Sequence, residues 1–167
     1  MFGERAVSWR TVWDELFPDP EAFDGPHDDN AAAEMNRLRG LVMAQASETE
    51  TVLGMILGRL VPSARTEKPA GALLRDVRTQ LSSQTGAAWA DALDLIDKAI
   101  KRRNHVVHNA VVIGSSWREY ATGDGGDWIP VISFMGDEEY SETELLDDLT
   151  LQHEATAAAV RVLHSLS

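Results

Sequence analysis

The sequence predicts a mainly α-helical protein, an antiparallel bundle of four to five helices with a small β-hairpin inserted before the last helix. Three observations predict this fold class. Apolar residues recur at steps of three and four over long segments, which is the period of an amphipathic helix. The breaks between the first helical patterns are short, which favours antiparallel neighbours. One late region instead has β-branched and aromatic runs on both sides of the turn-rich stretch GDGGD.

Composition narrows the class of protein further. The chain has 167 residues, of which 27 are acidic and 15 basic, so its formal charge is -12. This balance excludes a histone-like nucleic-acid coat, which needs many Lys and Arg contacts to phosphates. The sequence has no cysteine, which excludes disulfides and thiolate chemistry. It has neither a secretory signal pattern nor an apolar run of about 18 residues, so we expect a cytoplasmic protein without a membrane partner.

The chain is expected to divide near residue 30. Residues 1–30 are predicted to form a short amphipathic helix that ends before Pro18, followed by an acidic loop or arm rich in proline. Residues 31–167 are predicted to form the helical domain, with the hairpin insertion at about 110–136.

Three helical patterns open this domain. The first covers residues 31–60, with Asn30 available as its N-cap, and Pro62 stops it. A shorter pattern lies at residues 73–81 and is expected to break at Ser82, ahead of a glycine. The third pattern covers residues 89–108.

The last helix begins at a capping box formed by Ser141 and Glu144. Its inner stripe is predicted at Leu145, Leu149, His153, Thr156, Val160 and Leu163. We therefore expect His153 to be a core or interface histidine with a hydrogen-bond partner.

The hairpin between the third and last helices carries a proline and several aromatic residues. Pro130 is expected to confine the second strand to an edge, because proline cannot donate to a sheet ladder. Trp117, Tyr120 and Trp128 are expected to cover the end of the core, since most tryptophans are largely buried. The alternative is a surface for base stacking or partner binding.

The segment KRRNHVVHN, at the end of the third helical pattern, holds the strongest chemical signal. A helix that advances about 100° per residue puts Arg103, Asn104 and His108 on one broad face that includes an apolar stripe. Arg102 and His105 point elsewhere and are expected to be solvated. A guanidinium on an apolar stripe is costly to bury alone, so Arg103 should meet a carboxylate, an anion or a wet cleft.

Arg, Asn and His together suit metal-free cleavage of RNA. Imidazole transfers protons near neutral pH, a guanidinium stabilises charge on a phosphate, and the RNA 2′-hydroxyl supplies the nucleophile. One histidine is too few for both proton transfers, whereas a two-fold axis would bring a second His108 and Arg103 into one cleft. The alternative is structural, because Arg and His near a helix C-terminus also interact favourably with the last carbonyls.

The string Arg103-Asn104-His105-Val106-Val107-His108 resembles the R-x4-6-H motif of the HEPN superfamily, in which a polar residue often follows the arginine. The order of helices is also similar to the bundle of that family. The resemblance implies a homodimer with paired motifs and, in many members, metal-independent endoribonuclease activity in toxin-antitoxin or antiviral systems. It implies that Arg103 and His108 are the catalytic pair and that Asn104 supports them. A non-catalytic module that binds a nucleotide or a protein is the second hypothesis.

Charge and the absence of cofactor motifs lead to further expectations about binding residues, cofactors and partners. An acidic chain needs a local basic patch to bind RNA, so Lys101 and Arg102 are expected to bind the substrate beside Arg103. Glu48 or Glu50 is a candidate to pair with Arg103, although a solvated face is expected for both. No phosphate-loop or dinucleotide motif occurs, and we expect neither a cofactor nor a metal ion. An antitoxin or another defence-system protein is a possible partner.

Overall fold

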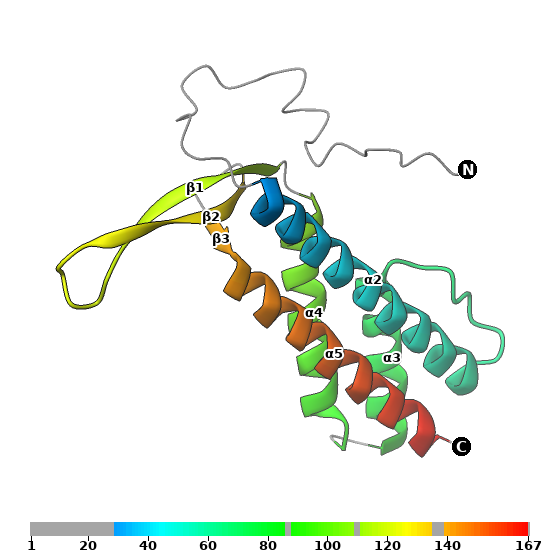
Figure 1. Ribbon diagram of the computed structural model, residues 1–167. Helices are drawn as coiled ribbons and strands as arrows, with labels where there is room; N and C mark the ends of the chain where they lie inside the picture. Colours follow the sequence, from blue (N-terminus) through cyan, green and yellow to red (C-terminus); the bar gives the residue numbers. More distant parts are fainter. Residues whose placement is uncertain (1–28, 86–87, 109–110, 135–138, 167) are drawn as a thin grey trace, which may run out of the picture. The chain divides into compact units, whose positions relative to one another are not determined.

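The computed structural model describes residues 29–85, 88–108, 111–134 and 139–166. In order along the chain, its elements are α2 (Asp29–Leu60), α3 (Ala70–Thr85), α4 (Ala90–His108), β1 (Val111–Glu119), β2 (Gly126–Phe134), β3 (Glu139–Ser141) and α5 (Glu142–Ser165) (Figure 1). The mainly helical class and the antiparallel β-structure ahead of the last helix are confirmed. The short helix and acidic arm predicted before residue 29 lie outside the described residues.

The chain divides into two compact units. One comprises Arg39–His108 and Leu146–Ser167, and the other comprises Met1–Leu38 and Asn109–Leu145. The first unit contains the largest apolar core, and the second contains the sheet. Within the described residues, no helix combines the length and the apolar character needed to cross a bilayer.

The core of the helical unit is built from all four described helices. Its buried side chains come from positions three and four apart in each helix, as an amphipathic face requires. They include Leu53 and Ile56 of α2, Leu73 and Val77 of α3, Leu93 and Ile96 of α4, and Ala155, Ala159 and Val162 of α5.

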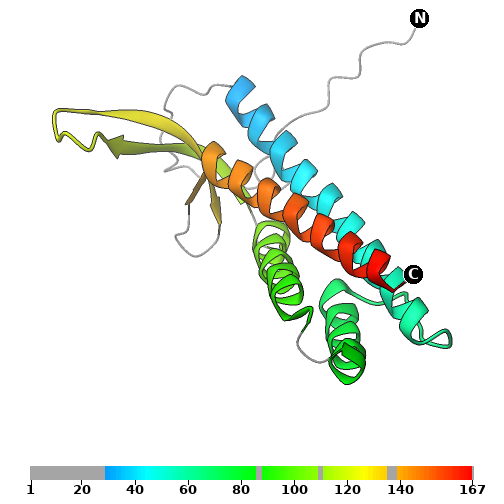
Figure 2. The same cartoon turned by 90° about the horizontal axis from the view of Figure 1, so that it is seen from below.

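Contacts between side chains fix the directions of these helices. Gln45 and Arg59 of α2 reach Thr156 and Leu163 of α5, respectively, so these two helices run in the same direction. On α4, Ala99 bonds Gln152 of α5 and Arg102 bonds Asp148, so α4 runs the opposite way (Figure 2).

The parallel pairing of α2 and α5 differs from a bundle in which all neighbours are antiparallel. The segment between α2 and α3 is long enough to turn back, and Thr66 lies against the backbone of Gly54 and Gly58. Thr66 packs close to both positions, since a Cβ atom on Gly54 or Gly58 would be in ordinary van der Waals contact with a Thr66 side-chain carbon at 3.7 Å. α3 therefore starts beside the middle of α2.

Several helix boundaries differ from those predicted. α2 already begins at Asp29, so Asn30 lies inside the helix. α3 continues to Thr85 instead of breaking at Ser82, because the serines and threonine of this turn still accept helical geometry and Ser83 bonds the carbonyl of Gln80. The capping box at the start of α5 is confirmed, since Glu144 Oε2 accepts the Ser141 backbone N–H at 2.7 Å.

The buried face of α5 is not the predicted stripe. The buried positions are Leu145, Asp148, Gln152, Ala155, Ala158, Ala159 and Val162, whereas His153 and Val160 are exposed. The expectation of a core position for His153 was wrong, and the alternative of an interface position stays a prediction. The predicted stripe followed apolar residues only. It therefore left out Asp148 and Gln152, the two polar side chains of the inner face, and included adjacent positions of the helix instead.

The sheet has the order β1-β2-β3, and all neighbouring strands are antiparallel. The pairing of β1 with β2 runs from Val111↔Phe134 to Glu119↔Gly126. β2 is therefore central rather than an edge strand, which corrects the prediction for Pro130. The proline is nevertheless tolerated because β3 pairs only with Val131–Ser133, so that side of β2 is open at Pro130.

The three aromatic residues of the hairpin do not cover a core. Trp117, Tyr120 and Trp128 are 47%, 48% and 46% exposed. They lie at the loop end of β1 and β2, beyond the segment of β2 that β3 pairs with, so the expectation that they are buried was wrong.

Candidate functional site

The candidate site lies in the last turns of α4. The inner face of this helix places Leu93, Ile96 and Ala99 in the core and resumes with the buried Val106. Between Ala99 and Val106 the same face passes through Arg102 and Arg103, which are both half-buried. Two guanidinium groups thus take positions that apolar side chains occupy elsewhere on the helix, and they point to different neighbours.

Arg103 faces α2 and the start of α3. Its Nη1 donates a hydrogen bond to Oδ1 of Asn104 at 2.9 Å. Its Nε is buried and has no acceptor among the described residues. A buried donor without an acceptor costs about 1–3 kcal/mol, so this arginine has unused capacity to bind an anion.

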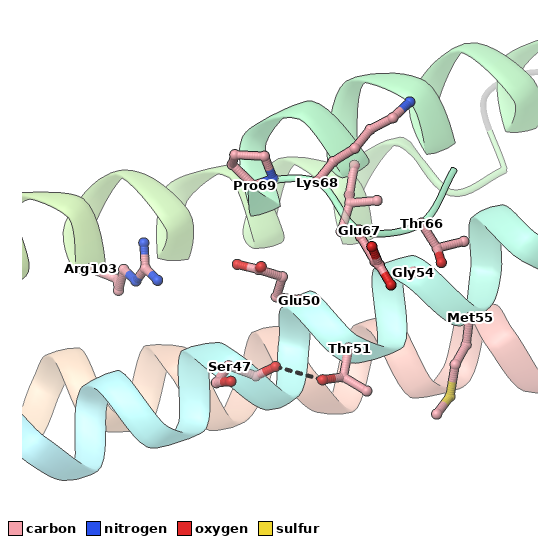
Figure 3. Close-up of a pocket in the computed structure, with 11 residues that line it drawn as sticks. Ser47, Glu50, Thr51, Gly54, Met55, Thr66, Glu67, Lys68, Pro69 and Arg103 are labelled. Carbon is pink, nitrogen blue, oxygen red and sulfur yellow. Dashed lines mark hydrogen bonds between the residues drawn. The ribbon is translucent and has the colours of Figure 1, made fainter. Parts of the chain in front are cut away.

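Arg103 lines a pocket of about 950 Å³. The opposite wall consists of residues from one face of α2, including Ser47, Glu50 and Thr51, and the end wall comes from the returning segment with Glu67 and Lys68 (Figure 3). The pocket lining therefore combines a guanidinium, an ammonium, two carboxylates and three hydroxyl groups, from α2, α4 and the segment between α2 and α3.

The pocket is lined by carboxylates as well as cations. Glu50, Glu67, Lys68 and Arg103 all line it, and the Lys68 ammonium pairs with Asp76 at 2.7 Å. Figure 3 shows the Arg103 guanidinium and the Glu50 carboxylate on facing helices, both turned into the space between them. No ion pair joins Arg103 to Glu48 or Glu50 in the part of the chain that the structure describes, and Glu48 instead accepts a hydrogen bond from Gln45.

The predicted triad is brought together only in part. Arg103 and the exposed Asn104 are in direct contact. His108 is the last residue of α4, which places its backbone about 7.5 Å farther along the helix axis than that of Arg103. The side chain of His108 lies outside the described residues, so its role stays a prediction.

Arg102 is not solvated as expected. Its Nε donates to Oδ1 of Asp148 at 2.8 Å, and the Asp148 side chain is only 3% exposed. Burial raises the pKa of Asp148, and the hydrogen bond and charge of Arg102 partly oppose that rise. His105, which was also expected in solvent, is half-buried, and its charge favours the same carboxylate. The expectations of solvation for Arg102 and His105 were wrong because α5 covers this side of α4.

The proposed substrate-binding cations already have acidic neighbours. The exposed Lys101 pairs with Asp97 at 2.7 Å, one helical turn earlier, and Arg102 pairs with Asp148. On α3, Arg78 pairs with Asp94 at 2.7 Å. The basic stretch of α4 is therefore partly neutralised within the helical unit, and the binding roles of Lys101 and Arg102 stay predictions.

Sequence reasoning missed two residues that shape the end of α4. Asp148 was passed over, although its spacing from Leu145 and Gln152 places it on the inner face of α5. Arg39 was also missed, and its Nε donates to the carbonyl oxygen of Val106 at 3.0 Å. That carbonyl belongs to the last turn of α4, where helices lack internal donors. Burial lowers the pKa of Arg39. Its position one turn after Met35, on the buried face of α2, could have indicated from the sequence that its side chain packs inside.

Comparisons of the chain with protein-family models, with curated proteins and with solved structures gave no significant match.

Proposed function

We propose that this protein is a HEPN-like, metal-independent endoribonuclease of the toxin-antitoxin or antiviral type, which acts as a homodimer in the cytoplasm. The observation that carries the proposal is Arg103. Its half-buried guanidinium lines a pocket and contacts Asn104, and one of its buried N–H groups has no acceptor in the part of the chain that the structure describes. A phosphate group would satisfy that donor and the positive charge together.

The chemistry needs only proton transfer and charge stabilisation. A base removes the proton of the RNA 2′-hydroxyl, and the oxygen attacks the adjacent phosphorus. The bond from phosphorus to the 5′-oxygen breaks, and an acid protonates that leaving oxygen. His108 supplies the proton transfers, Arg103 stabilises the charge on the phosphoryl oxygens, and Asn104 holds Arg103 in place. The products are a 2′,3′-cyclic phosphate and a 5′-hydroxyl.

The homodimer belongs to the proposal because each chain offers one motif histidine. Two protons move in the reaction, one from the nucleophile and one to the leaving group. A two-fold axis beside the end of α4 supplies a second His108 and a second Arg103 to the same cleft. RNA is the substrate of this composite site, with Lys101 and Arg102 in contact with flanking phosphates, and an antitoxin or another defence protein is its regulator.

A second function is favoured by one specific observation. Glu50 and Glu67 line the pocket with Arg103, and Lys68 is already paired with Asp76, so an RNA backbone gains little net attraction there. A non-catalytic HEPN-like module, which binds a nucleotide or a protein segment at Arg103, accommodates this balance without difficulty. It differs from the nuclease in one measurable respect, since the purified module never cuts RNA.

RNA cleavage in the presence of a chelator separates the two functions. We expect the wild type to cut an unstructured RNA in EDTA and to leave cyclic phosphate ends. His108→Ala and Arg103→Ala should each lower the cleavage rate by about 100-fold or more, as expected when a proton-transfer or charge-stabilising group is lost. His153→Ala and Arg75→Ala are matched controls, because both side chains are exposed on other helices. Equal rates for wild type and His108→Ala would refute the nuclease, and absence of cleavage in all proteins would favour the module.

A further inference from the structure

The loop end of the β1–β2 hairpin, residues 117–128, has aromatic side chains that the folded chain leaves half in solvent. Trp117 stands directly opposite Trp128 in the strand register. The two indole rings meet edge to face, with centroids 5.8 Å apart and planes inclined by 65°. With Tyr120 they form a group of three rings, each between 46% and 48% exposed.

Glycines hold these rings in place from one side. A Cβ atom on Gly126 would lie 2.8 Å from two carbons of the Trp117 ring, so this ring lies directly against the Gly126 backbone. Gly125, with φ of 145°, brings its backbone to the Tyr120 ring in the same way, at 3.4 Å from its own Cβ position. Gly125 O also accepts the Tyr120 N–H at 2.8 Å. These backbone contacts restrict the Trp117 and Tyr120 rings before any partner arrives, which lowers the entropy lost on binding.

The surroundings of the three rings are acidic. Glu119, Asp124 and Asp127 all lie within residues 117–128 and are exposed. Asp127 accepts a hydrogen bond from the Tyr120 hydroxyl at 2.8 Å, which fixes its carboxylate beside the ring. Arg118 is the cation of this segment, and it pairs with Glu139 at 3.1 Å. The hairpin end therefore offers ring faces together with carboxylates.

We propose that the hairpin end, residues 117–128, docks a Lys- or Arg-bearing segment of a partner protein. A cation over an indole or phenol face is attracted by the ring quadrupole, and a nearby carboxylate completes its coordination. The same carboxylates repel a phosphate backbone, which disfavours base stacking by RNA here. No residue of this surface lines the pocket at Arg103, so the proposal stands independently of the proposed nuclease.

The test is binding of fluorescent peptides to the full chain. The probe is a peptide of alternating Arg and Gly residues, compared with a Glu-Gly peptide of the same length and with a labelled oligoadenylate RNA. We expect the wild type to bind the cationic peptide and not the acidic one, and more weakly as salt rises, whereas any binding of the RNA should be the same in the wild type and in Trp117→Ala. Trp117→Ala should weaken binding of the cationic peptide by about tenfold, the upper range for a partly desolvated cation-ring contact.

A second variant tests charge while it keeps the rings. Glu119→Gln combined with Asp124→Asn should weaken binding several-fold and reduce its salt dependence. Asp91→Asn combined with Glu154→Gln makes the same change in net charge on exposed helix positions, and Leu146→Ala removes an exposed apolar side chain from α5. Both controls should bind like the wild type. Equal weakening by the two charge variants, unchanged peptide binding by Trp117→Ala, or RNA binding that Trp117→Ala abolishes would each overturn the proposal.

Discussion

At the scale of single residues, the last turns of α4 are held by polar side chains of other helices, which apolar periodicity does not predict. Asp148 on α5 holds Arg102 from one side, and Arg39 on α2 bonds the Val106 carbonyl from the other. Arg103 lines the pocket beside α2, and its buried Nε has no acceptor among the described residues. The polar residues that fix the helix are thus distinct from the residue that we propose binds phosphate, and variants can separate the two roles.

Asp148 should make stability depend on pH in an unusual direction. Its pKa in the folded protein is raised by burial, so its contribution is fully present below the unfolded pKa of about 3.9 and is lost as pH rises through the folded value. Asp148→Asn keeps an oxygen acceptor for Arg102 and removes this titration. We expect the stability of Asp148→Asn relative to wild type to increase from pH 3.5 upward until the raised pKa is passed.

Urea unfolding of both proteins across this range measures the difference directly. Asp91→Asn removes a carboxylate from an exposed position of α4 and is the control for the loss of one acidic side chain. A flat difference for Asp148→Asn, or one that falls as pH rises, would contradict a buried carboxylate with a raised pKa.

Arg39 should stabilise the last turn of α4. Arg39→Ala leaves the Val106 carbonyl without its donor, so we expect a loss of about 1–2 kcal/mol in unfolding free energy. Amide exchange in the last turn of α4 should also become faster. Arg37→Ala removes an exposed arginine that pairs with Glu34 of the same helix, and should leave the urea midpoint unchanged. Identical exchange rates in wild type and Arg39→Ala would show that the bond does not hold the helix end.

At the scale of elements, the sequence predicts the long amphipathic helices well, because burial in them follows apolar spacing. α2 and α4 match their predicted spans within two residues. The inner face of α5 could not be predicted in this way, since Asp148 and Gln152 are buried there through hydrogen bonds rather than apolarity. β3 has only three residues, with Tyr140 as its buried position, which is too short for an alternating pattern.

The candidate site shows the same limit. Arg103 and Asn104 are adjacent in sequence, and their contact follows from local helix geometry. The pocket, in contrast, depends on the segment after α2 turning back along Gly54 and Gly58, which brings Lys68 near the level of Arg103. Two glycines in a helix indicate close packing, but they do not indicate which segment packs there.

The hairpin provides a prediction at this scale. Gly126→Ala places a methyl group against the Trp117 ring and the Arg118 carbonyl. We therefore expect the hairpin to lose about 1–3 kcal/mol of stability. The exciton-coupled circular dichroism of the Trp117 and Trp128 pair should decrease. Gly114→Ala, on the same strand pair, has nothing within 4 Å of its Cβ position and should keep the signal. Loss of the signal in both variants would mean that the ring contact does not depend on Gly126.

At the scale of the whole molecule, net charge and oligomeric state decide whether the proposed chemistry works. A chain with a formal charge of -12 repels RNA over most of its surface. One pocket with balanced charge gives weak binding, whereas two copies of Arg103 and His108 in one cleft concentrate cationic and proton-transfer groups. The proposed nuclease therefore requires the homodimer, because one chain supplies only one motif histidine for two proton transfers.

The most direct test of the shared site is to measure the specific activity of the wild-type protein on RNA, in EDTA, over a dilution series. Sedimentation at the same concentrations gives the fraction of dimer. We predict that cleavage per chain falls as the dimer dissociates, in proportion to the remaining dimer. Undiminished cleavage by a dissociated monomer would contradict a shared site, and a stable dimer that does not cleave RNA would contradict the nuclease itself.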